Sequence, residues 1–228
     1  MNYGYEENNV VVDQTNISDL YKKTFFLMFL GLLATGLVSW YTYASGLFEK
    51  ILIDGTFNLL IIAEVLFVLI FSATMRKMSP TVVQILFFVY SALNGITMSV
   101  IFAVYQLSSI TLVFFASSIL FAIFAFIGNY TKIDLSKLSP ILFGTLIVGV
   151  IVSIINLFIG NSLLDIGLSW VILFTFFGVT AYDMQKLKSL ANSNIVDINK
   201  LHIYGAFELY LDFINIFLRI LRLFGRRK

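Results

Sequence analysis

Seven apolar stretches, each about as long as a lipid bilayer is thick, constrain this sequence more than any other feature. An α-helix needs roughly 20 apolar residues to cross about 30 Å of hydrocarbon. Stretches of this kind lie at residues 24–43, 57–74, 81–103, 110–128, 140–159, 164–183 and 203–224. Only 12% of the 228 residues are charged, against about 25% in soluble domains. The sequence therefore predicts an all-α integral membrane protein, a bundle of seven transmembrane helices.

The segment before the first apolar stretch is acidic and differs from the rest of the chain. It carries four acids before Lys22 and Lys23, which is typical of neither a secretory signal peptide nor a transit peptide. We expect residues 1–23 to form a cytoplasmic N-terminal arm and residues 24–228 to form one seven-helix transmembrane domain. The chain has no Cys and a formal charge of only +2. Disulfides and thiol nucleophiles are thereby excluded, and nucleic acid is not an expected partner.

The distribution of lysine and arginine predicts that the N-terminus is cytoplasmic. Among the first six spans, the outer connections would hold only Lys50, whereas the cytoplasmic segments would hold a group of basic residues. That group is Lys22, Lys23, Arg76, Lys77, Lys132, Lys137, Lys186, Lys188 and Lys200. A seventh span would place residues 226–228, which are all basic, on the outer side. The last stretch therefore either crosses the membrane against this rule or lies on the cytoplasmic surface as an amphipathic helix.

Polar side chains repeat along the last apolar stretch at helical spacing. Steps of four and three residues separate Glu208, Asp212, Asn215, Arg219, Arg222 and Arg226. This spacing places them within about 80° on one face of a helix. Ionisable groups cost about 2.5–3.5 kcal/mol each near mid-bilayer, so the face would cost on the order of 10 kcal/mol against lipid. We therefore expect the last helix to be central in the bundle and its polar residues to be buried or to line a pore.

Three carboxylates are expected to meet near the cytoplasmic side. Asp183 ends the sixth stretch, and Glu208 and Asp212 lie in the first turns of the seventh, at similar depth. Carboxylates held together away from water cannot all ionise easily, and their oxygens suit a hard cation such as calcium. Asp183 and Asp212 are thus the candidate pH sensor, ion gate and calcium site. In the alternative interpretation, Asp183 is only an interfacial residue beside Lys186.

Two further charged residues belong to the second stretch. Glu64 lies deep within it and, on an otherwise apolar segment, is expected to face the bundle interior. Arg76 follows at the cytoplasmic end, near the expected height of Asp183, and could latch a gate by ion pairing. The alternative is that Arg76 and Lys77 only anchor the helix at the cytoplasmic surface.

Three motifs resemble the signatures of a known family. They read YTKIDLSKL at 130–138, TAYDMQKLK at 180–188 and LYLDFINIFLRILRLFG at 209–225. They are similar to those of the bacterial branch of the Bax inhibitor-1 family, and the likeness covers the chain from about Tyr21. The resemblance implies a seven-helix bundle with the last helix central, in the plasma (inner) membrane of a bacterium.

The same resemblance implies a function. In the family, two aspartates from the sixth and seventh helices form the proton-sensing pair of a pH-sensitive calcium leak. By motif these are Asp183 and Asp212, and Arg76 is the candidate for the arginine that latches the first of them in the closed state. The implied partners are the lipid bilayer and the calcium ion, which would be the permeant or bound ion, and no other cofactor is implied.

Two other classes of function compete with a calcium leak. A non-conducting regulator that binds other membrane proteins would use the same acids for packing or for a response to pH. An intramembrane aspartyl protease would also need two aspartates on neighbouring helices. However, the Gly-x-Gly-Asp sequence expected at the second aspartate is absent, since residues 209–212 read LYLD. No HExxH, phosphate-binding glycine loop or Gly-x-Ser-x-Gly occurs either, so we expect no enzymatic activity.

Overall fold

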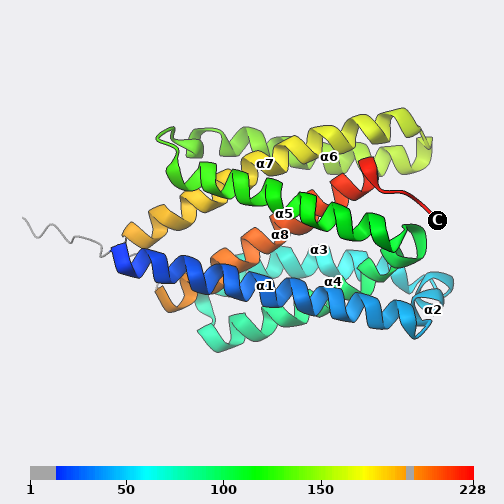
Figure 1. The fold of residues 1–228 in the computed structure, drawn as a ribbon, viewed down its shortest axis with the longest axis horizontal. Coiled ribbons are helices and arrows are strands. Elements are labelled where there is room, and N and C mark those ends of the chain that lie inside the picture. The colour runs from blue at the N-terminus through cyan, green and yellow to red at the C-terminus, as the bar shows by residue number, and fades with distance from the viewer. Residues whose placement is uncertain (1–13, 194–197) are drawn as a thin grey trace, which may run out of the picture.

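The computed structural model describes residues 14–193 and 198–228, and within these residues the chain is all-helical (Figure 1). The α-helices are α1 (Gln14–Ala44), α2 (Leu47–Ile53), α3 (Thr56–Thr74), α4 (Pro80–Val104), α5 (Leu107–Tyr130), α6 (Ser139–Ile159), α7 (Ser162–Ser193) and α8 (Ile198–Phe224). Two short 3₁₀ helices are η1 (Met75–Lys77) and η2 (Leu135–Lys137). The predicted all-α class is confirmed.

Six helices of the described chain are long and apolar enough to cross a membrane, namely α1, α3, α4, α5, α6 and α7. The protein is therefore a transmembrane protein. The structure does not confirm the predicted count of seven spans, because α8, with 27 residues, is not among these six. The short helix α2, which the sequence did not predict, lies in the connection between α1 and α3.

Three helix ends differ from the predicted ones, all at the polar edge of an apolar stretch. α7 continues past Asp183 to Ser193, and α8 begins before Ile203. The added residues include Met, Gln, Lys, Leu and Ala, which favour helix regardless of their polarity. α1 begins at Gln14, so residues 14–23 of the predicted N-terminal arm are helical, and residues 1–13 lie outside the described residues.

α8 occupies the centre of the bundle, the position that its polar face predicts (Figure 1). It packs against α1, α4, α5 and α7. Side chains on several sides of α8 are almost fully buried, among them Phe207, Tyr210, Ile216 and Leu221. At 1.5 Å per residue, its 27 residues extend about 40 Å, which is enough to run the length of the bundle.

The segment after α8 is attached to the connection between α4 and α5. The backbone N–H of Gln106 donates to the carbonyl of Arg226 (3.0 Å), and that of Lys228 donates to the carbonyl of Val104 (2.9 Å). The Lys228 ammonium also donates to the Tyr43 hydroxyl at 3.1 Å. These contacts place the end of α8 at the end of the bundle where α1 stops, opposite the start of α1.

Gly128 of α5 allows α5 and α7 to pack closely. A Cβ atom at this position would overlap the carbonyl oxygen of Ala181. We expect Gly128→Ala to destabilise the protein by about 1–3 kcal/mol, because backbone must move to admit the methyl group. Gly144→Ala on α6 is the control, since nothing lies within 4 Å of its Cβ position. Thermal unfolding in detergent measures both variants, and an unchanged Gly128→Ala would contradict the close packing.

Candidate functional site

The structure brings Asp183 of α7 and Asp212 of α8 together inside the bundle. Their exposed fractions are 6% and 2%. The two carboxyl groups are close enough to interact electrostatically. Oδ1 of Asp183 and Oδ2 of Asp212 are buried and accept no hydrogen bond from any described residue. Because a buried, unpaired carboxylate is costly to keep ionised, this place is suited to hold a proton or to meet a cation. Asp183 lies well inside α7, so it is not a residue at a helix end.

Lys186 and Glu208 complete a carboxylate cluster, which we define as Asp183, Lys186, Glu208 and Asp212. The Lys186 ammonium donates to Glu208 Oε1 and to the Tyr204 hydroxyl, each at 2.6 Å. The side chains of Lys186 and Glu208 are 24% and 21% exposed. Glu208 is close enough to both aspartates to interact with them electrostatically. Glu208 is therefore ion-paired with Lys186, whereas neither aspartate forms an ion pair with a described residue.

The carboxylate cluster does not form a ready metal site. Among residues 14–193 and 198–228, no three His, Cys, Asp or Glu side chains are arranged to hold a metal ion. Calcium takes six to eight oxygen ligands, so the predicted calcium pair, Asp183 and Asp212, would leave most ligands to water. Such a pair can attract a calcium ion but cannot enclose it.

A pocket of about 400 Å³ lies next to the carboxylate cluster. It is bounded by the α5–α6 connection and by α7, and Lys186 is one of its lining residues. Gln185 holds the two walls together: its Oε1 accepts from the Leu135 N–H and its Nε2 donates to the Ile133 carbonyl, both at 2.8 Å. Asp134 also lines the pocket, and hydrogen bonds from Ser136 hold the pKa of Asp134 below its usual range. The pocket thus has a carboxylate that stays charged at neutral pH.

Glu64 faces the interior, as predicted, and belongs to a second buried polar group. Its carboxylate accepts from the Thr97 hydroxyl (2.6 Å) and the Asn94 amide (3.4 Å). Asn94 Oδ1 in turn accepts from the Tyr210 hydroxyl at 3.2 Å, and the Tyr210 and Thr35 hydroxyls lie 2.7 Å apart. This chain of contacts joins α3, α4, α8 and α1.

The remaining predicted residues do not join the carboxylate cluster. The Asn215 side chain donates to the Leu211 carbonyl of its own helix at 2.8 Å. Arg222 pairs with Asp165 at the start of α7. Arg219 forms no hydrogen bond or ion pair with any described residue and lines pockets at the far end of α8. Arg76 lies in η1, but its side chain is outside the described part of the chain, and so is the predicted latch.

Comparison with known proteins decides the family. A family model described as "Inhibitor of apoptosis-promoting Bax1" matches residues 17–228, nearly the whole chain. The chain belongs to the Bax inhibitor-1 family. This confirms the resemblance seen in the motifs.

Relatives of this Bax inhibitor-1 protein occur in several bacteria. "Inner membrane protein YbhL" of Escherichia coli K12 is 36% identical over 227 residues, which are 97% of each chain. An uncharacterized membrane protein of Streptococcus pyogenes serotype M1 is 37% identical over 166 residues, 72% of each chain. An uncharacterized protein of Borreliella burgdorferi is 31% identical over 211 residues, 90% of this chain and 91% of its own.

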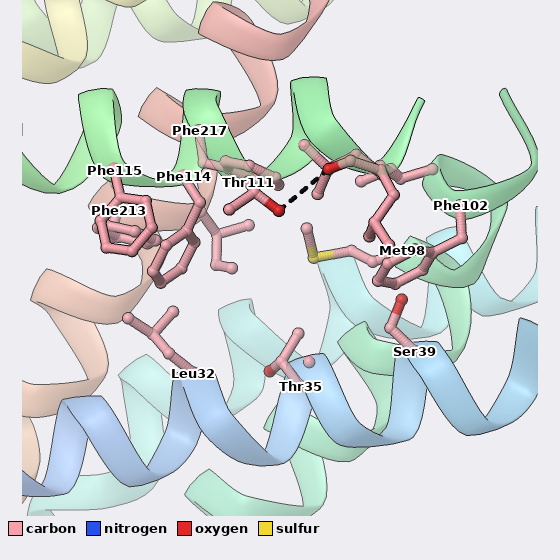
Figure 2. A pocket seen from close by; sticks show the side chains of 15 residues that line it. Leu32, Thr35, Ser39, Met98, Phe102, Thr111, Phe114, Phe115, Phe213 and Phe217 are labelled. Atoms are coloured by element: carbon pink, nitrogen blue, oxygen red, sulfur yellow. Dashed lines mark hydrogen bonds between the residues drawn. The ribbon is translucent and has the colours of Figure 1, made fainter. Parts of the chain in front are cut away.

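In this Bax inhibitor-1 protein an apolar cavity lies apart from the charged residues. It has a volume of about 350 Å³ and lies between α1, α4, α5 and α8 (Figure 2). Figure 2 shows Thr35 and Ser39 of α1 on one side and Phe114 and Phe115 of α5 on another. None of its lining residues is charged, which argues against a role as a cation path.

The roles of Lys186, Gln185 and Tyr210 were not predicted from the sequence. Lys186 was treated only as a neighbour of Asp183, although their three-residue spacing places both on one face of α7. Gln185 and Tyr210 were not singled out. Tyr210 lies two residues from Asp212, which turns it toward nearly the opposite side of α8 from the polar stripe.

Proposed function

We propose that this Bax inhibitor-1 protein is a pH-sensitive calcium leak of the bacterial inner membrane, gated by Asp183 and Asp212. One observation carries the proposal: two buried carboxylates on neighbouring helices each have an oxygen with no hydrogen bond from the described residues. If the two aspartates had only a structural role, we would expect all their oxygens to accept hydrogen bonds, since buried polar groups are usually hydrogen-bonded. No enzymatic activity is part of the proposal.

The pocket beside α7 provides the approach from one end of the bundle. Asp134 at its wall is ionised at neutral pH and attracts cations. Lys186 lines the same pocket and its charge acts on Asp183. A cation moving toward the aspartates would therefore meet the Lys186–Glu208 ion pair first. This pair is the candidate barrier of the leak.

The direction of the pH effect follows from the charge of the aspartate pair. When both carboxylates are protonated they carry no charge and hold a divalent cation poorly. When a proton is lost as the pH rises, the pair becomes negative and attracts calcium. Protonation therefore closes the leak, and the flux should increase with pH. Water completes the coordination of the passing ion, which favours weak binding and release.

The membrane arrangement is part of the same proposal. We infer that α8 is a seventh crossing, because it runs through the bundle and ends opposite the start of α1. The N-terminus is then cytoplasmic, as the lysines and arginines of the first six spans favour. The inner membrane is inferred from the printed name of the Escherichia coli relative.

Calcium entry into dye-loaded proteoliposomes tests the proposal. Purified protein is reconstituted, and the flux is compared with that of empty liposomes at pH values of about 6, 7 and 8. We expect flux above the empty control that increases across this range. Flux that never exceeds the control would overturn the leak and favour a non-conducting regulator that binds other membrane proteins.

A further inference from the structure

A basic pocket lies at the end of the bundle opposite the start of α1. Its volume is about 680 Å³, and it is bounded by the end of α6, the start of α7, and α8 with its following segment. Three arginines line it, Arg219 and Arg222 from α8 and Arg227 from the segment after it, together with one acid, Asp165. The pocket thus has a surplus of two positive charges.

Arg219 lines this pocket without a partner among the described residues. Arg222 is paired with Asp165, whereas Arg219 forms no hydrogen bond or ion pair with a residue in the described ranges. Its side chain is only partly exposed. A desolvated guanidinium without a counter-ion is unfavourable. None of its five N–H donors is bonded to a residue in the described ranges.

The surroundings favour a phosphate group as the ligand. Guanidinium groups bind phosphate through paired, charge-assisted hydrogen bonds. In the same wall, the Asn156 side chain donates to the Asn161 carbonyl and accepts from the Asn161 backbone N–H, each at 3.1 Å, and these two bonds keep the turn between α6 and α7 in place. They therefore shape the pocket, and the arginines provide its charge.

The pocket also adjoins surface that faces lipid. Val150 and Ile154 of α6 line it and are 58% and 52% exposed, and Leu163 at the start of α7 is 78% exposed. Apolar side chains exposed on a transmembrane helix contact acyl chains. A phosphate held by the arginines would therefore lie at the level where the headgroups and acyl chains of a lipid meet.

We propose that Arg219, Arg222 and Arg227 form a binding site for a phosphate group at this end of the bundle. The group belongs either to an anionic phospholipid, which the adjoining apolar surface favours, or to a free phosphate ion. The site is separate from the carboxylate cluster and does not depend on the protein being a calcium leak.

Thermal unfolding of the full chain in detergent tests the site. One series adds phosphatidylglycerol to the micelles, a second adds the same amount of diacylglycerol, which lacks the phosphate, and a third adds sodium phosphate at constant ionic strength. We expect phosphatidylglycerol to raise the Tm and diacylglycerol not to do so. In Arg219→Gln the apparent Kd for the phosphate-bearing ligand should increase about tenfold.

Two variants separate loss of the site from loss of the fold. Arg226→Gln is the matched control, because Arg226 is exposed, follows the same helix and does not line the pocket. It should keep the full Tm shift. Arg227→Gln lies outside every helix and should weaken binding even if Arg219→Gln proves poorly folded.

Each outcome of these titrations has a defined meaning. A shift with phosphatidylglycerol alone identifies a lipid headgroup site, and a shift with both phosphate-bearing ligands shows that the ion itself is recognised. An equal shift with diacylglycerol would show that only the acyl chains matter and would overturn the proposal. Shifts that survive in both Arg219→Gln and Arg227→Gln would overturn it as well.

Discussion

Asp212→Asn should abolish the dependence of calcium flux on pH and keep the flux at the low level that the parent shows near pH 6. The asparagine amide has nearly the shape of the carboxyl group but cannot ionise. It therefore mimics the protonated aspartate at a position that is only 2% exposed. If one proton controls the path, flux changes by up to about tenfold per pH unit. The difference between parent and variant should accordingly be largest near pH 8.

The control variants show whether the effect belongs to the buried pair. Asp183→Asn should reproduce the result, because its carboxyl group lies beside Asp212. Asp54→Asn should behave like the parent, since Asp54 is exposed in the connection between α2 and α3. A flux that still increases with pH in both Asp183→Asn and Asp212→Asn would mean that another group senses the proton.

Lys186→Gln should increase calcium flux on the order of tenfold while preserving its increase with pH. Removing one positive charge lowers the repulsion of a divalent cation on its way to Asp183, and about 1.4 kcal/mol corresponds to tenfold in rate. The charge of Glu208, now unpaired, adds to the attraction. Glutamine keeps N–H donors that can replace the ammonium as a donor to Glu208 and Tyr204.

Lys188→Gln is the matched control for this substitution. Lys188 lies on the same helix, but its ammonium donates to the Asn129 carbonyl of α5 at 2.9 Å instead of pairing with the carboxylate cluster. Its removal should leave the flux unchanged. An unchanged or lower flux in Lys186→Gln, with the protein still folded, would exclude the Lys186–Glu208 pair as the barrier.

The helices could be predicted because membrane insertion depends on length and apolar content, which a sequence displays directly. The bounds of α3 to α6 agree with the apolar stretches to within a few residues. The end of α7 and the start of α8 could not be found in this way. There the helix continues into polar sequence, where helix propensity rather than hydropathy decides.

The meeting of Asp183 and Asp212 was predictable because a bilayer places residues of equal depth at one level. The partner of each side chain was not, because partners depend on how each helix is rotated about its axis. Lys186 pairs with Glu208 rather than with Asp183 for this reason. The link from Glu64 through Asn94 to Tyr210 likewise depends on how α3, α4 and α8 pack.

The central position of α8 also bears on how the protein is made. The ribosome completes α1 to α7 before α8, yet α1, α4, α5 and α7 all pack against α8. Until then, the surfaces that will surround it, including the buried Asp183, can contact only one another, lipid or water. Assembly of the bundle is therefore a late event that follows insertion of the earlier helices, and it must draw a segment containing Glu208 and Asp212 into their midst.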